Sequence, residues 1–171
     1  MMAMAEEIIN KVAQSPLVSL DLETFFPRDG VRIFDLKPYL FMELILKEKD
    51  FRASLQQTDW SVYQGKYVGI TCSADAIIPV WAYMLVASYL QPVAADVIMG
   101  NEQQVTEQVL IRAIRQMDTA EFADKRVVVK GCGELPIGPS AYMEITGRLL
   151  PVVKSIMYGE PCSTVPVFKK K

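Results

Sequence analysis

The sequence predicts an α/β protein in which a mixed, largely parallel sheet carries helices on both faces. Short apolar runs alternate with helical patterns in the second half of the chain, and this alternation is typical of parallel strands joined by right-handed crossovers. The 171 residues are 51% hydrophobic and 22% charged, which is enough apolar material for one core. Glycine and proline are scattered rather than clustered. No linker is therefore predicted, and residues 1–171 are expected to form a single α/β domain.

The first third of the chain predicts a hairpin followed by helices. Residues 17–26 (LVSLDLETFF) and 31–36 (VRIFDL) alternate apolar and polar side chains as strands do, and the intervening PRDG predicts a turn. We therefore expect an N-terminal β-hairpin. From Asp35 to Gln57 the pattern becomes helical, with Asp35 as the expected N-cap and the apolar stretch YLFMELIL buried on most sides. Asp50 is expected to cap a second helix in this stretch.

The rest of the chain predicts a Rossmann-like βαβαβα core. Each expected strand is short and apolar, as strands buried on both faces are. The middle helix carries the clearest signature, because Asn101 and Gln104 have the spacing of a capping box. The expected strands cover 66–72, 94–100 and 126–132, and the expected helices cover 76–90, 101–117 and the residues from Ser140 onward.

The lack of histidine excludes several classes of catalytic site. None of the 171 residues is a histidine, so Ser-His-Asp triads, Cys-His pairs and histidine-based metal sites cannot form. The segment GELPIGPS, from Gly133 to Ser140, has the spacing of a phosphate-binding loop, but Pro139 stands where that loop needs lysine. No predicted strand ends in GxGxxG. We expect neither NAD nor FAD as a cofactor.

The charge and hydropathy patterns predict neither nucleic acid nor a membrane as a partner. The formal net charge of −2 offers no general attraction to phosphate backbones. The longest apolar run, residues 76–90, is shorter than the roughly 20 residues that span a bilayer. The first residues lack the basic and apolar regions of a secretion signal, so we expect a cytoplasmic location. The three cysteines are then expected to be free thiols.

Two of the thiols end predicted strands. Cys72 closes KYVGITC and Cys132 closes RVVVKGC, and ligands of open α/β sheets bind at the carboxyl ends of the strands. Lys130, two residues before Cys132, favours a thiolate. Cys132, Cys72 and Lys130 are the catalytic candidates, and the amides of Gly131 and Gly133 are candidates for binding a cofactor. Burial as a small apolar residue explains either thiol alone equally well.

The position of Cys162 depends on the segment before it. An unbroken helix over residues 140–158 would carry Cys162 to the opposite side of the sheet from the other thiols. Gly147 and Pro151 interrupt this segment. Two arrangements stay open: the segment folds back and the three thiols meet, or Cys162 lies elsewhere, at a subunit interface.

A metal site is predicted if the three thiols meet. Thiolates suit zinc or iron, and an open fourth position indicates exchange or transfer rather than a closed structural site. A carboxylate, water or an incoming ligand would fill that position. The candidate metal ligands are Cys72, Cys132, Cys162, Asp75 and Glu160. If the thiols do not meet, one reactive thiol still supports persulfide or acyl chemistry.

Asp21 and Glu23, in DLET, form a further candidate group. They lie on one face of the first predicted strand and form a candidate carboxylate pair, although an exposed strand face explains them equally well.

Four stretches are specific enough to carry a resemblance. They are DFR at 50–52, ITCSADAIIPVWAYML at 70–85, KGC at 130–132 and KSIMYGEPCSTVP at 154–166, and together they contain all three cysteines. Through these stretches the sequence resembles, over nearly its whole length, a bacterial family of unknown function, DUF2480. The resemblance implies no activity of its own. It implies a partner role in sulfur or metal handling beside iron-sulfur cluster assembly proteins.

Three functions follow from these observations. The leading one is a cytoplasmic protein whose cysteines bind a metal ion or handle sulfur, as an accessory in iron-sulfur cluster assembly. The second is a non-catalytic interaction module that forms homo-oligomers, such as a homodimer, and whose cysteines are structural. The third is a thiol-dependent enzyme that acts on a small molecule. The sequence leaves open whether the protein is an enzyme.

Overall fold

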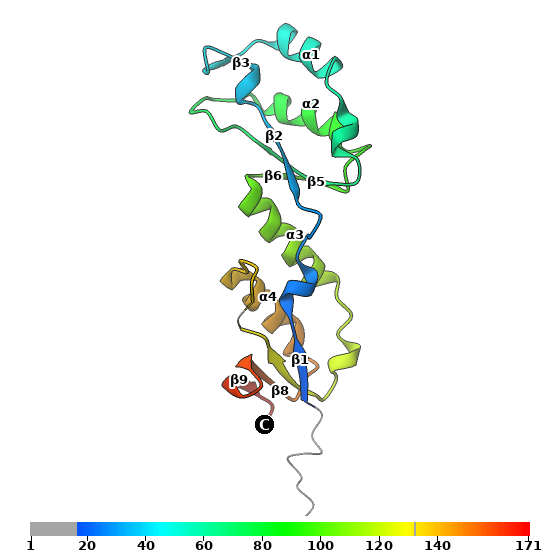
Figure 1. Cartoon of the computed structure of the whole chain (residues 1–171), viewed down its shortest axis with the longest axis vertical. Helices are drawn as coiled ribbons and strands as arrows, with labels where there is room; N and C mark the ends of the chain where they lie inside the picture. Colours follow the sequence, from blue (N-terminus) through cyan, green and yellow to red (C-terminus); the bar gives the residue numbers. More distant parts are fainter. Residues whose placement is uncertain (1–16, 132) are drawn as a thin grey trace, which may run out of the picture. The chain divides into compact units, whose positions relative to one another are not determined.

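Parallel strands and helices alternate along the chain (Figure 1). This computed structural model describes residues 17–131 and 133–171. The chain divides into two compact units. Met1–Phe25 and Ala113–Lys171 form the terminal unit, and Phe26–Arg112 form the central unit. Among the described residues, none of the helices combines the length and the hydropathy that a membrane span needs.

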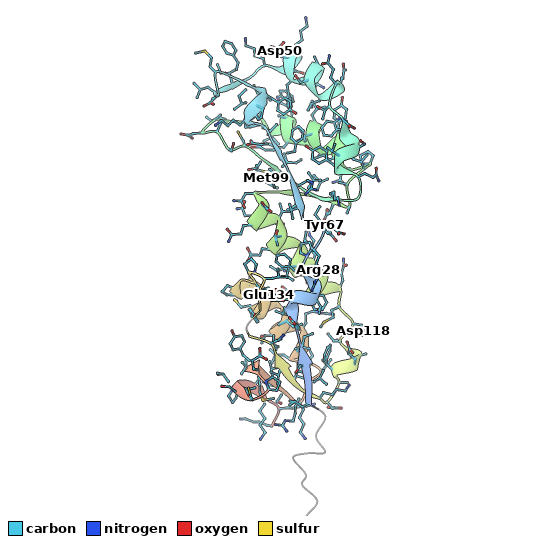
Figure 2. All side chains as sticks on the ribbon, in the orientation of Figure 1. Arg28, Asp50, Tyr67, Met99, Asp118 and Glu134 are labelled. Carbon is cyan, nitrogen blue, oxygen red and sulfur yellow. The ribbon has the colours of Figure 1, made fainter. Side chains whose placement is uncertain are left out.

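The central unit is built on a parallel sheet with the strand order β2-β5-β6. Tyr67 opens β5 and Met99 closes β6, and both are labelled in Figure 2. The middle strand, β5, is the most buried one, as its apolar sequence predicts. The strands are β2 (Val31–Asp35), β5 (Tyr67–Thr71) and β6 (Asp96–Met99), and the helices are α1 (Glu48–Gln56) and α2 (Val80–Leu90).

Aromatic side chains fill the core of the central unit. Phe34 of β2 stacks on Tyr39 and Trp60, with ring centroids 5.4 and 5.5 Å apart. Trp60 also stacks on Tyr89 of α2 at 4.9 Å. The Trp60 indole N–H donates to the Leu55 carbonyl oxygen at 3.1 Å, so its polar group is satisfied at the end of α1.

A hairpin lies between β2 and α1, so the helix predicted from Asp35 is wrong over residues 37–46. Asp35 Oδ1 accepts a hydrogen bond from the Lys37 amide at 2.9 Å and caps only a short turn. The strands β3 (Leu40–Phe41) and β4 (Ile45–Leu46) then pair antiparallel. Between them, Met42 and Glu43 have φ values of 52° and 57°, which a right-handed helix does not allow. Residues 41–45 of the apolar stretch are therefore exposed, whereas Tyr39, Leu40 and Leu46 are partly buried.

The cap predicted for one helix is confirmed, and the cap predicted for another is wrong. Asn101 and Gln104 exchange two hydrogen bonds of 3.0 and 2.9 Å, which confirms the capping box before α3 (Glu102–Gln116). The helix α1 begins at Glu48 with Lys47 as its N-cap residue, so the prediction that Asp50 caps it is wrong. Asp50 lies within the first turn, where its charge still suits the helix dipole.

The terminal unit contains a four-stranded sheet with the order β1-β7-β8-β9. The first three strands are parallel, and β9 runs antiparallel to β8 with a register shift between Ile156 and Met157. The blue β1 and the orange and red β8 and β9, from opposite ends of the chain, share this sheet (Figure 1). The elements are β1 (Leu17–Leu20), β7 (Arg126–Val129), α4 (Pro139–Leu149), β8 (Ser155–Glu160) and β9 (Ser163–Lys169).

The predicted N-terminal hairpin is wrong, because β1 and β2 belong to different sheets. Leu17 of β1 pairs with Arg126 of β7, and Val31 of β2 pairs with Tyr67 of β5, both in parallel. The strand β1 ends at Leu20, after which a 3-10 turn replaces the longer strand that the alternation predicts. The α/β class with mostly parallel strands is confirmed, but the βαβαβα strands divide between two sheets. That residues 1–171 form one domain stays a prediction.

The chain folds back after α4, as one of the two arrangements for Cys162 requires. The helix ends at Leu149, and Pro151 follows it. The strand β8 then returns parallel to β7. Pro161 and Cys162 connect β8 to β9, with Glu160 and Ser163 paired across the turn. The sequence pattern continued the helix here and missed both strands.

Candidate functional site

The carboxyl ends of β1, β7 and β8 lie at one edge of the terminal sheet, because these neighbouring strands are parallel. Asp21 directly follows β1, Lys130 directly follows β7, and Glu160 is the last residue of β8. Three chain segments that are distant in the sequence thus bring charged residues to the same edge. Ligands of parallel α/β sheets bind at this edge.

Lys130 is held in place by Asp21. The Lys130 Nζ atom lies 3.3 Å from Asp21 Oδ2, and both side chains are partly exposed. The hydrogen bond and the charge of Asp21 raise the pKa of Lys130, and the charges of Glu160 and Glu23 raise it further. Lys130 is therefore a cation at neutral pH.

Glu23 fastens the segment after β7 to the segment after β1. Its Oε1 atom accepts a hydrogen bond from the Leu135 amide at 3.0 Å, and its own amide donates to Asp21 Oδ1 at 2.9 Å. The carboxylate lies directly over Gly133, where a β-carbon would be only 1.6 Å from Oε1. Gly133 therefore makes room for the carboxylate. Glu134, which is labelled in Figure 2, lies in the same loop.

Two tyrosines hold the other side of this loop. The Tyr158 hydroxyl donates to the Gly131 carbonyl oxygen at 3.1 Å, and the Tyr142 hydroxyl donates to the Lys130 carbonyl oxygen at 3.3 Å. Their rings meet edge to face with centroids 5.5 Å apart. A β-carbon at position 131 would lie 2.7 Å from Tyr158 Cζ, so a larger residue there would displace the Tyr158 ring.

Two adjoining hollows open at these residues. We call the first, of about 310 Å³, the polar pocket, and the second, of about 820 Å³, the apolar cavity. Both are lined by Gly131, Ile137 and Tyr142, so they adjoin at these residues. The other residues of the polar pocket are Asp21, Glu23, Lys130, Gly133, Leu135 and Pro136.

Some of the site residues predicted in the terminal unit line the polar pocket. Lys130, Gly131 and Gly133 all line it. Cys132 lies outside the described residues, although both of its chain neighbours are part of the lining. Cys162 is exposed in the turn after β8. The roles predicted for these residues stay predictions.

The remaining candidates, Cys72 and Asp75, belong to the central unit. Cys72 follows β5, is partly buried and packs against the aromatic core, with its Sγ atom 3.6 Å from the Ala74 carbonyl oxygen. Asp75 is exposed in the same loop. Over residues 17–131 and 133–171, no group of three or more cysteine, aspartate or glutamate side chains is placed to hold a metal ion. The shared three-cysteine site therefore stays a prediction.

A different carboxylate organises the loop that contains Cys72. The Asp35 side chain accepts hydrogen bonds from the Ser73 amide, the Ser73 hydroxyl and the Lys37 amide. Burial raises the pKa of Asp35, but these hydrogen bonds outweigh it and hold the pKa below its ordinary value. The ionised Asp35 side chain, at the carboxyl end of β2, is thus hydrogen-bonded to Ser73, just after the carboxyl end of β5.

The sequence pattern did not identify the roles of some residues of the terminal site. Asp21 and Glu23 stood out only as a carboxylate pair on a strand face, whereas they follow the strand and turn toward the loop after β7. Tyr142 and Tyr158 carried no sequence signal, because their role depends on which strands are neighbours. The one local signal was the acidic DLET directly after an apolar strand.

The comparisons with known proteins show one family. Neither the curated proteins nor the solved structures include a significant match to the chain. Residues 6–170 match the family described as "Protein of unknown function (DUF2480)". The match covers nearly all of the 171 residues, and the chain therefore belongs to the DUF2480 family.

Proposed function

We propose that this chain carries sulfur or a thiophilic metal ion at the polar pocket, as a cytoplasmic accessory in iron-sulfur cluster assembly. One observation carries the proposal: the residues on both sides of Cys132 line a pocket that also contains Lys130 and two carboxylates. Cys132 stands between Gly131 and Gly133 in the sequence, and we therefore propose it as the reacting thiol.

The charged groups of the pocket have separate roles in the proposal. Lys130 stays protonated beside Asp21 and supplies positive charge to a thiolate or a persulfide anion. Glu23 accepts a hydrogen bond from the Leu135 amide and so ties Leu135 to the segment after β1. Glu160 and Cys162, at the end of the neighbouring strand, supply further oxygen and sulfur atoms at the same edge.

Sulfur transfer would need only the one thiol. The Cys132 thiolate attacks the outer sulfur of a persulfide donor, a new S–S bond forms at Cys132, and the S–S bond of the donor breaks. The donor leaves as a thiolate, so the exchange needs no outside oxidant or reductant. Lys130 balances the anion that the pocket retains.

Metal binding would use thiolate and carboxylate donors together. This donor set suits zinc or iron. The candidate ligands within the terminal unit are Cys132, Cys162 and Glu160. The ion would serve as cargo or would activate a bound sulfur group.

Chemical analysis of the purified protein separates these possibilities. We would measure zinc, iron, acid-labile sulfide and cyanide-reactive sulfane sulfur in anaerobically purified wild type and in the Cys72→Ser, Cys132→Ser and Cys162→Ser variants. Sulfane sulfur lost only in Cys132→Ser supports sulfur transfer. Near-stoichiometric metal lost in Cys132→Ser and in Cys162→Ser supports a metal site. Wild type that holds neither, with thiols that react slowly, contradicts the proposal.

The role of Lys130 has its own test. Lys130→Met keeps the length of the side chain and removes the charge, so alkylation of Cys132 by iodoacetamide at neutral pH should slow by about three- to tenfold. Lys154→Met, at an exposed lysine of the same unit, is the matched control. Equal alkylation rates in the two variants would remove Lys130 from the mechanism.

A second candidate function rests on apolar side chains that the central unit exposes. Ile77, Val80 and Met84 lie before and within α2 and are 94%, 74% and 68% exposed. A contiguous exposed apolar surface is typical of an interaction site. In this alternative the protein is a homo-oligomeric module. Sedimentation that shows a dimer in wild type and a monomer in Met84→Lys would favour it.

A further inference from the structure

The side of α4 that points away from the core is apolar. One row of this helix is fully buried and faces the core of the terminal unit: Ala141, Ile145 and Leu149. Met143, Gly147 and Leu150 lie on the opposite side, because about 3.6 residues form each turn, and all three are exposed. On a surface helix the side opposite the core is normally polar. The outward side of α4 thus has the character of a surface that a partner covers.

Both charged residues of α4 contact the end of α3. The Arg115 guanidinium donates two hydrogen bonds to the Glu144 carboxylate, at 3.0 and 3.1 Å. Arg148 donates to the Met117 carbonyl oxygen at 2.7 Å. These contacts use one flank of the helix, so the outward side and the flank toward β9 carry no charged residue.

The strands β8 and β9 extend this apolar surface. Tyr158 and Val165 are directly opposed in the antiparallel pair, so their side chains lie on the same side of the sheet. The contact between Tyr158 and Tyr142 of α4 shows that this is the side on which α4 packs. Val167 lines the apolar cavity together with α4. We call these exposed residues the α4–β9 face: Met143, Gly147, Leu150, Tyr158, Val165 and Val167.

The size and the charge of the α4–β9 face suit the core of a protein interface. Its five large side chains are 40–75% exposed. At roughly 100 Å² for each of them, the face offers about 500 Å² of apolar surface, which a polar rim would extend to the about 800 Å² per partner of a stable interface. None of the residues that line the adjoining apolar cavity is charged. Interface cores are depleted of charge in the same way.

Gly147 indicates which partner fits. A β-carbon built on it would have no atom within 4 Å, so packing within the chain gives no reason for a residue that weakens a helix. Without a side chain at this position, another helix can approach closely between Met143 and Leu150. A twofold axis beside Gly147 would place Met143 of each copy next to Leu150 of the other. The outward side of α4 therefore complements itself, as the interface of a twofold dimer must.

We propose that this protein forms a homodimer through the α4–β9 face, in which the α4 helices of two copies cross beside Gly147. The face belongs to the terminal unit and differs from the α2 surface of the central unit considered above. The argument uses neither the thiol chemistry nor the α2 surface, so each proposal can fail alone.

Sedimentation equilibrium of the full chain tests the partner and the face. Wild type should be a dimer that dissociates on dilution. Met143→Lys should raise the dissociation constant of the dimer at least about a hundredfold, because the dimer would bury an unpaired charge. Met143 is 75% exposed in the single chain, so this variant should fold. Met84→Lys, at an exposed methionine of α2, is the matched control and should dimerise as wild type does.

Two results of this measurement would overturn the proposal. One is a wild type that is monomeric at all concentrations. The other is dissociation of the dimer by Met84→Lys and not by Met143→Lys, which would assign the interface to the α2 surface instead.

Gly147→Leu separates close helix packing from general apolar association. Leucine makes the face more apolar and would strengthen unspecific association. If the helices cross at Gly147, the same side chain holds the two backbones apart and should weaken the dimer at least about tenfold. Gly147→Ala should also weaken the dimer while it raises the thermal stability of the dilute, monomeric protein. A Gly147→Leu dimer as tight as wild type, or tighter, would overturn the crossing at Gly147.

Cross-linking locates the twofold axis. The background carries Cys72→Ser, Cys132→Ser and Cys162→Ser, so that an introduced thiol is the sole one. Gly147→Cys should form a disulfide between two copies on mild oxidation, because a disulfide joins α-carbons within roughly 7 Å. Gln108→Cys, at an exposed position of α3, is the control and should stay monomeric on a non-reducing gel. Equal yields of covalent dimer from the two variants would overturn the position of the axis.

Discussion

Gly133 and Glu23 depend on each other through a single steric contact. A β-carbon at position 133 would overlap the Glu23 carboxylate, which accepts the Leu135 amide. Gly133→Ala should therefore lower the free energy of unfolding by about 1–2 kcal/mol, because it displaces that carboxylate from a partly buried amide. Glu23→Ala should lower it by a similar amount, and the double variant should add little to either. Urea unfolding measures all three, and fully additive effects would contradict this account.

Asp35 makes the stability of the protein depend on pH in the acid range. Its hydrogen bonds hold the pKa below the ordinary value of 3.8, so the ionised form stabilises the folded state above that pH. The contribution is lost as the pH falls through the lowered pKa. Asp35→Asn should therefore be less stable than wild type at a pH of about 6, and the difference should shrink as the pH falls below 3.8.

Urea midpoints measured across this range check the prediction. Asp75→Asn is the control, because Asp75 is an exposed aspartate of the same loop. If the difference in urea midpoint between Asp35→Asn and wild type stayed constant from neutral to acid pH, the stabilising effect of the hydrogen bonds would not depend on the ionisation of Asp35.

At the scale of an element, the turn between β3 and β4 is under backbone strain. Met42 and Glu43 both have positive φ, a conformation that asparagine and glycine adopt more easily. Met42→Asn with Glu43→Gly should raise the free energy of unfolding by about 1 kcal/mol. Thermal unfolding of the double variant measures this gain. The control is Glu48→Gly in the first turn of α1, which should lower the thermal stability of the protein. If the double variant were also less stable than wild type, the turn would not be strained.

Elements with a strong local signal were predictable from the sequence. The helix α3 has both a capping box and an apolar face, and it begins and ends within a residue of the prediction. The hairpin at 40–46 was not predictable, because its apolar residues have the composition of a buried helix and its turn lacks glycine. The sequence indicated the interruption of the helix at Gly147 and Pro151, but it did not predict the strands β8 and β9 that follow.

At the scale of the whole molecule, tryptophan fluorescence can test whether the two units unfold together. The chain contains two tryptophans, Trp60 and Trp81, and both belong to the central unit. Their fluorescence therefore reports the central unit, whereas circular dichroism reports the helices of both units. If residues 1–171 form the single domain that we predict, the two signals should share one urea midpoint. Separate midpoints would show two independently unfolding units.

The sequence could not predict which strands lie next to one another in the two sheets. An apolar strand such as β7 suits any parallel neighbour, so the sequence pattern predicts the strand but not the sheet. The same limit applies to the site. Lys130, Gly131 and Gly133 were predicted from one segment, whereas Asp21 and Glu23 join them only because β1 is the neighbour of β7.

The strand β9 also affects how the protein behaves at high concentration. Among the described residues it is one of the two outer strands of its sheet, and it carries Pro166 next to the register shift against β8. Proline removes one amide donor, and an irregular register interrupts the flat ladder that another chain would need for pairing. The sequence STVPVFK is rich in β-formers, so these two interruptions protect the protein from edge-to-edge aggregation.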